Sequence, residues 1–101
     1  MAEKDVAGVL GLAQKAGKLA SGDLVVKEAL AGGKAKLLII AEDAAPKTEK
    51  ELRFLAEKAD VPVTQYMKRA ALGDCIGKAP RAAAAVLDKG FAGLILKKMN
   101  V

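Results

Sequence analysis

Positively charged and small residues cluster around Ser21-Gly22-Asp23, where the sequence pattern predicts the start of a helix. Lys15 and Lys18 precede this segment, and Lys27 follows it by about one helical turn. The first backbone N–H groups of a helix lack partners within the helix, and Gly22 has no side chain to keep a ligand away from them. Cations beside such a helix end could bind an anion such as a phosphate or a guanine edge of a kinked RNA. The alternative is an ordinary solvated basic face, because lysines are mostly exposed whatever their function.

A second basic segment, residues 77–81, joins a predicted helix to the last predicted strand. It reads Gly-Lys-Ala-Pro-Arg, and Arg69 precedes it by one helix. Loops at one end of the sheet converge in an α/β sandwich, so we expect this loop to lie beside Gly22. The two loops would then form one site.

Other kinds of chemistry lack the residues that they need. Residues 11–18 superficially resemble a phosphate-binding Walker loop, but five residues separate the glycines instead of four, and Leu19 replaces the metal-binding Ser or Thr. Cys75 lies at helical spacing from apolar residues in a chain without histidine, which favours a core position over a nucleophile. Glu42 and Asp43 directly follow an apolar run, so we interpret them as a strand-end loop that caps the next helix, not as metal ligands.

The composition favours one folded domain over residues 1–101. These residues are 52% hydrophobic and carry 17 Lys and Arg against 12 Asp and Glu, a net charge of +5 with an isoelectric point near 9.4. This balance favours a polyanionic partner. The N-terminal apolar stretch is far shorter than the roughly 20 residues of a membrane span, so we expect a cytoplasmic protein without membrane contact. Because the chain has no histidine and a single cysteine, we expect no metal site, and we expect no cofactor. The three aromatic residues are scattered, so RNA contacts should involve phosphates and shape.

Hydrophobic periodicity predicts alternating helices and short strands. The first helix has a possible cap at Asp5 and an end at Gly17; the second begins at residues 21–23 and ends at Gly32-Gly33. A capping box formed by Thr48 and Glu51 opens the third, which is broken at residues 60–62. Further helices run from residue 68 to residue 77 and from a capping Asp88 to the basic residues Lys97 and Lys98. Their buried stripes include Val6, Val9, Leu10, Ala13, Val26, Ala29, Leu30, Leu52, Leu55, Ala56, Ala59, Ala71, Leu72, Ile76, Phe91, Leu94, Ile95 and Met99.

Four strands are expected between these helices, at residues 19–20, 36–41, 63–66 and 82–87. Residues 36–41 form a continuous apolar run, which is typical of a central strand buried on both faces. Residues 82–87 lack helical amphipathicity and lie between a proline-containing loop and Asp88. Five helices and about four strands in a mixed sheet predict an α/β fold, a single-domain three-layer α/β/α sandwich.

In order and spacing, five segments resemble a ribosomal-protein family that binds kink-turn RNA, the large-subunit seven-Ae and thirty-e type, and within it a YlxQ-like bacterial branch. They are GLAQKAGKLASG (11–22), GKAKLLIIAEDAAP (33–46), VPV (61–63), ALGDCIGK (71–78) and AVLDKGFA (85–92). The resemblance implies a non-catalytic α/β/α sandwich. Its second helix would dock its N-terminus beside sheared G·A pairs, and the loop before the last strand would cover a flipped-out base.

The resemblance also implies roles for individual residues. Gly22 and Asp23 match the start of the family's second-helix motif, Lys27 its basic residue one turn on, and residues 78–81 its second loop. The family's Asn-Glu pair, which reads guanine edges, is replaced here, because Asp23, Leu24 and Val25 follow Gly22. Base readout and phosphate contacts are separable, so this difference affects kink-turn specificity and not a general preference for RNA.

The leading hypothesis is therefore a non-catalytic protein that binds a structured RNA, such as ribosomal RNA or another kink-turn RNA, and that could also contact ribosomal proteins. The alternative is a protein-interaction module of the same fold with reduced or lost kink-turn specificity. The predicted RNA-binding residues are Lys15, Lys18, Ser21, Gly22, Asp23, Lys27, Lys34, Arg69, Lys78, Ala79, Pro80 and Arg81.

Overall fold

A computed structural model describes residues 2–99, in which helices and strands alternate along the chain. The helices are α1 (Ala2–Lys15), α2 (Asp23–Ala31), α3 (Pro46–Lys58), α4 (Arg69–Cys75) and α5 (Lys89–Lys98). The strands are β1 (Leu19–Ser21), β2 (Leu37–Ile40), β3 (Val63–Gln65) and β4 (Ala83–Val86).

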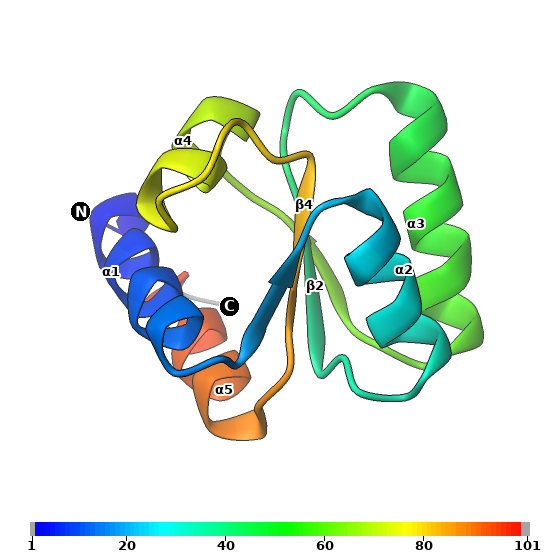
Figure 1. Cartoon of the computed structure of the whole chain (residues 1–101), viewed down its shortest axis with the longest axis horizontal. Coiled ribbons are helices and arrows are strands. Elements are labelled where there is room, and N and C mark those ends of the chain that lie inside the picture. The colour runs from blue at the N-terminus through cyan, green and yellow to red at the C-terminus, as the bar shows by residue number, and fades with distance from the viewer. Residues whose placement is uncertain (1, 100–101) are drawn as a thin grey trace.

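The four strands form one mixed sheet in the order β1-β4-β2-β3. Strand β4 pairs antiparallel with both β1 and β2, whereas β3 pairs parallel with β2. Helices α2 and α3 cover one face of the sheet, and α1, α4 and α5 cover the other (Figure 1). This arrangement confirms the predicted three-layer α/β/α sandwich.

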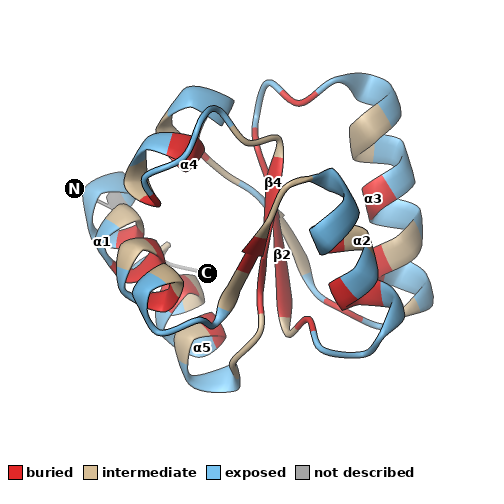
Figure 2. Ribbon diagram, viewed as in Figure 1, coloured by how far each residue is buried: buried red, intermediate tan, exposed pale blue. Residues whose placement is uncertain are grey.

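The core lies on both faces of the two central strands. Every residue of β2 and β4 is buried, as Figure 2 shows for the middle of the sheet. Alanine has a low intrinsic preference for strands, yet Ala83, Ala84 and Ala85 form β4. They do so because β4 lies between two strands and is covered by helices on both faces, and burial outweighs local propensity. No helix of the described residues is long and apolar enough to cross a membrane.

Three local predictions are wrong. Helix α1 already includes Asp5, so this residue does not cap it. Helix α3 begins at Pro46, which places Thr48 inside its first turn instead of at a capping box; proline suits the first turn because its missing N–H would have no helical partner there. The Leu94 side chain is 39% exposed, whereas Leu96 packs partly buried against the core.

Asp88, in contrast, caps α5 as predicted. Its carboxylate accepts a hydrogen bond from the Phe91 backbone N–H at 2.9 Å. This contact satisfies one free donor of the first turn. Helix α5 therefore starts soon after β4 ends, with Lys89 as its first residue.

Candidate nucleic-acid interface

The N-terminus of α2 is open to a ligand. Gly22 precedes this helix with φ 97° and ψ 143°, a backbone conformation that favours glycine, and a Cβ there would meet nothing within 4 Å. Within residues 2–99, no side chain caps α2. The N–H groups of its first turn are therefore available to an external acceptor.

The loop that joins α4 to β4 lies directly beside this helix end. Arg81 Nε donates a hydrogen bond to Ser21 Oγ at 3.3 Å, although 60 residues separate them in the chain. The Arg81 backbone N–H also donates to the Arg69 carbonyl at 3.1 Å. Because β1 pairs with β4, Ser21 lies opposite Ala84, and the two loops emerge at the same end of the sheet. We call this the proximal surface, formed by residues 21–23, 78–81 and Arg69.

Gly73 allows the second loop to reach this position. A Cβ on Gly73 would lie 2.9 Å from the Pro80 Cα and still closer to the Ala79 carbonyl group. The Lys78 backbone N–H donates to the Gly73 carbonyl at 2.9 Å, so the loop folds tightly back over α4. We did not identify Gly73 from the sequence, because a glycine inside a helix does not reveal which segment packs against it.

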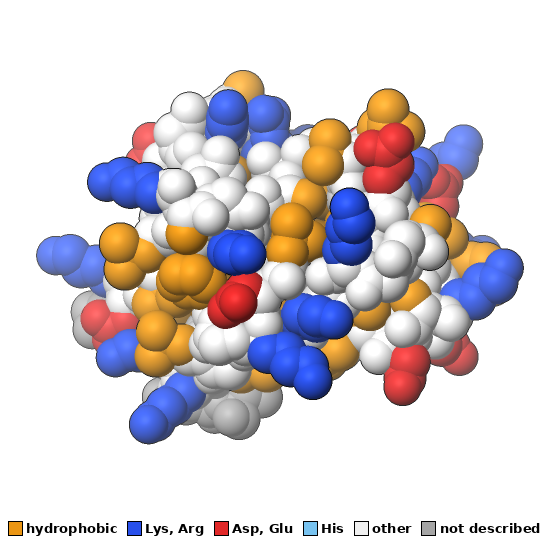
Figure 3. All heavy atoms as spheres, turned by 60° about the horizontal axis from the view of Figure 1, so that its bottom comes forward, with side chains coloured by type: hydrophobic (Ala, Val, Ile, Leu, Met, Phe, Trp, Pro, Cys, Tyr) orange, Lys and Arg blue, Asp and Glu red, His pale blue; other side chains and the backbone are white. Residues whose placement is uncertain are grey.

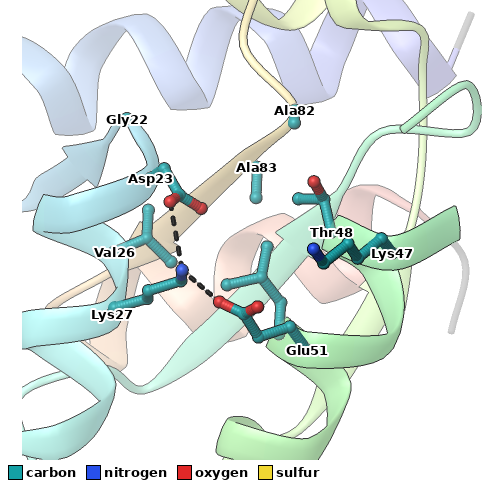
Figure 4. Close-up of a pocket in the computed structure, with 10 residues that line it drawn as sticks. Gly22, Asp23, Val26, Lys27, Lys47, Thr48, Glu51, Ala82 and Ala83 are labelled. Carbon is teal, nitrogen blue, oxygen red and sulfur yellow. Dashed lines mark ion pairs between the residues drawn. The ribbon is translucent and has the colours of Figure 1, made fainter. Parts of the chain in front are cut away.

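A pocket of about 250 Å³ opens next to Gly22, between α2 and α3. Figure 4 shows the Lys27 side chain between two carboxylates, Asp23 at 3.1 Å and Glu51. The hydrogen bond to Glu51, and to a smaller extent the one to Asp23, raises the pKa of Lys27 above its usual 10.5. The charge of Lys27 is thus balanced within the protein. Lys47 lines the same pocket from α3 and is exposed; the sequence pattern did not indicate it.

The predicted lysines do not all surround α2. Lys18 accepts a hydrogen bond from the Leu87 N–H at 2.8 Å through its backbone carbonyl, which places it where β1 begins and β4 ends. Lys15 precedes it at the end of α1, and Lys34 follows the far end of α2. These three residues therefore lie at the opposite end of the sheet from Gly22, where the α1–β1 and α2–β2 connections run in the lower part of Figure 1. The expectation that Lys15 and Lys18 flank the α2 N-terminus is wrong. Both lysines precede β1, whereas Gly22 follows it, so the length of the strand separates them from the start of α2.

Asp43 caps a helix, but not the next one along the chain. Its carboxylate accepts a hydrogen bond from the Arg69 backbone N–H at 2.8 Å, at the start of α4, and lies 3.6 Å from Arg69 Nε. The backbone hydrogen bond is the main cause that lowers the pKa of Asp43 below its usual 3.8. The predicted capping of α3 is wrong because β2 and β3 are parallel, which brings the segments after both strands together.

We predict that Asp43→Asn reduces the loss of stability in acid. The depressed pKa means that ionised Asp43 stabilises the fold above its usual value of 3.8, and that this contribution disappears as pH falls through the lower folded-state value. Unfolding midpoints in urea, measured between about pH 6 and about pH 3, should therefore converge for the variant and the wild type at the acid end. Asp74→Asn serves as the control, because Asp74 is an exposed acid on α4, the helix that Asp43 caps. A constant difference across this range would contradict the assignment.

Nothing in the described part of the chain resembles a catalytic or metal centre. The Cys75 thiol is half-buried and donates to the Leu72 carbonyl, with 3.2 Å between sulfur and oxygen. Burial raises the pKa of Cys75, which opposes formation of a reactive thiolate. No group of three or more potential metal ligands occurs within residues 2–99.

The chain is similar to known proteins over most of its length. The chain is 40% identical over 93 residues to the RNA-binding protein YlxQ of Bacillus subtilis, covering 91% of this chain and 92% of that protein. It is 33% identical to the large ribosomal subunit protein eL8 of Picrophilus torridus, over 87% of this chain and 70% of that protein.

Two solved structures are also similar. A protein of unknown function from Bacillus halodurans shares 31% identity, with a TM-score of 0.89 over 95% of this chain and 97% of that one. The fold also matches a Giardia lamblia 15.5 kDa RNA-binding protein at 19% identity, with a TM-score of 0.77 over 98% of this chain and 85% of that one. A family model matches residues 4–95, and the chain belongs to the ribosomal protein L7Ae/L30e/S12e/Gadd45 family.

Proposed function

We propose that this chain is a non-catalytic RNA-binding domain that contacts a structured RNA through the proximal surface. The observation that carries the proposal is the hydrogen bond from Arg81 to Ser21, which joins the second loop to the uncapped N-terminus of α2. Free backbone donors and cations then face the same ligand, and a polyanion with phosphates at several positions can use both. The names of the YlxQ and eL8 relatives support RNA as this ligand.

A kinked RNA, such as a kinked segment of ribosomal RNA, fits this surface best. Gly22 would admit close approach of the RNA, while Lys47, Lys78 and Arg81 would contact phosphates. Leu24 and Val25 are 70% and 49% exposed at the start of α2 and offer no hydrogen bonds to base edges from their side chains. Recognition would therefore depend on RNA shape and backbone more than on sequence.

A second candidate function follows from the same two residues. Exposed Leu24 and Val25 beside a helix end are also suited to contact another protein, such as a ribosomal protein. The balanced charge of Lys27 is consistent with this alternative, because it removes one cation from phosphate binding. In that case the fold would be a protein-interaction module with little affinity for RNA.

Charge reversal tests the two candidates. We expect Lys47→Glu combined with Lys78→Glu to weaken binding to a kinked RNA at least tenfold, and to reduce the salt dependence by about 0.7 to 0.9 log units for each phosphate that the variant no longer neutralises. Filter binding across a salt series, with a straight duplex of equal length, measures both quantities. Lys4→Glu with Lys97→Glu, exposed lysines of α1 and α5, gives the matched change in net charge. Absence of wild-type binding to either RNA at low salt would reject the proposal and leave the protein-interaction module.

A further inference from the structure

Five lysines lie at the end of the sheet opposite the proximal surface. They come from the end of α1, the segment before β1, the α2–β2 loop, the residue before β2 and the start of α5. We call them the distal surface: Lys15, Lys18, Lys34, Lys36 and Lys89. In the view of Figure 3, which brings this end forward, Lys and Arg side chains gather across the middle of the face; an acidic side chain lies among them, and others lie toward the margins.

Strand order explains why residues so distant in sequence come together. Strand β4 runs antiparallel to both neighbours, so its end meets the beginnings of β1 and β2. The Leu87 N–H donates to the Lys18 carbonyl at 2.8 Å, and the Lys36 N–H donates to the Val86 carbonyl at 2.7 Å. Lys36 and Lys89 also line one shallow hollow. Backbone hydrogen bonds to the end of β4 therefore hold Lys18 and Lys36 of the distal surface in place.

The charges of the distal surface are not balanced within the protein. Within residues 2–99, none of its lysines forms an ion pair. Asp60 lines the hollow with Lys36 and Lys89, and Asp88 uses its carboxylate to cap α5. Beside the proximal surface, Lys27 pairs with Asp23 and Glu51, and within it Arg69 pairs with Asp43. The positive charge of the distal surface is thus available to an external anion.

The chemistry of the distal surface suits a phosphate backbone. Lysine ammonium groups are compact, strongly hydrated charges that contact phosphates without reading bases. The residues that line the hollow beside Lys36 and Lys89 include no aromatic side chain on which a base could stack. Helix α2 has nine residues and separates the proximal from the distal surface by about 14 Å. Ligands at the two surfaces would therefore not need to contact the same residues.

We infer that the distal surface binds the phosphate backbone of a second RNA segment, so that one protein molecule can hold two RNA segments together. This inference rests on the proposed function, because the first segment occupies the proximal surface. Binding at the distal surface would be independent of sequence, weaker than at the proximal surface and steeply dependent on salt.

A bridging experiment tests the inference. Two kinked RNAs, one with a donor and one with an acceptor fluorophore, are mixed with the full chain at less than one protein per RNA. We expect energy transfer at low salt that disappears when protein is in excess, since each RNA then binds its own molecule. The distal variant combines Lys18→Gln, Lys34→Gln, Lys36→Gln and Lys89→Gln. We expect its affinity for a single RNA to lie within about threefold of the wild-type value, and its energy-transfer signal from bridging to fall at least tenfold.

The control variant removes the same charge elsewhere, with Lys4→Gln, Lys50→Gln, Lys97→Gln and Lys98→Gln, and should bridge like the wild type. Equal loss of bridging in this control, or full bridging by the distal variant, would overturn the inference. Tight binding of one RNA by the wild type without any energy transfer would overturn it as well, while leaving the proposed function intact. Displacement of the second RNA by polyglutamate at equal charge concentration would instead indicate an acidic protein partner and overturn it too.

Discussion

Gly73→Ala is expected to destabilise the fold by about 2 to 4 kcal/mol and to weaken RNA binding at the same time. The added methyl group would lie 2.9 Å from the Pro80 Cα, and the nearest atoms belong to backbone, which cannot move aside as a flexible side chain does. Either α4 or the loop must shift. A shift of the loop would carry Arg81 away from Ser21 and separate the two halves of the proximal surface.

Urea unfolding measures the first effect, and filter binding of folded protein measures the second. Gly93→Ala is the matched control, because Gly93 is also helical and a Cβ there would meet nothing within 4 Å. This control should be neutral or stabilise by up to about 1 kcal/mol, since alanine favours helix over glycine. Wild-type stability together with wild-type RNA affinity for Gly73→Ala would show that the loop does not pack on α4 as described.

Ile39→Ala should cost about 2 to 5 kcal/mol of unfolding free energy, a large share of the usual stability of a small domain. Ile39 is fully buried in the middle of β2, where it pairs with Thr64 of β3 and Ala84 of β4. Its neighbours in the sheet include the small alanine side chains of β4, which can do little to fill the cavity that the substitution would leave. Denaturant unfolding monitored by circular dichroism gives the value.

Ile39→Val provides the graded comparison, with an expected loss of about 0.5 to 1.5 kcal/mol because only one methyl group is removed. Both variants should bind RNA like the wild type under conditions where they remain folded, since Ile39 reaches neither surface. A loss for Ile39→Ala no larger than that for Ile39→Val would mean that this part of the core is not tightly packed.

Local patterns in the sequence were sufficient for most of the elements. Hydrophobic periodicity located all five helices, and a continuous apolar run identified β2 as a central strand. Asp88 was recognised as a cap because its contact spans three residues. The errors at Asp5 and Thr48 occurred at helix ends, where several residues compete as the first residue of a helix and local sequence alone does not decide among them.

The sequence by itself determined the fold class, the start of α2 next to Gly22 and the basic character of the loop at residues 77–81. The tertiary structure alone decided which charges act together. It brought Arg81 to Ser21, placed Lys27 between two carboxylates, and moved Lys15, Lys18 and Lys34 to the far end of the sheet. Helix and strand patterns depend on contacts between near neighbours in the chain. The grouping of charges depends on strand order and direction, which are set by packing between segments 60 or more residues apart in the chain, such as β1 and β4.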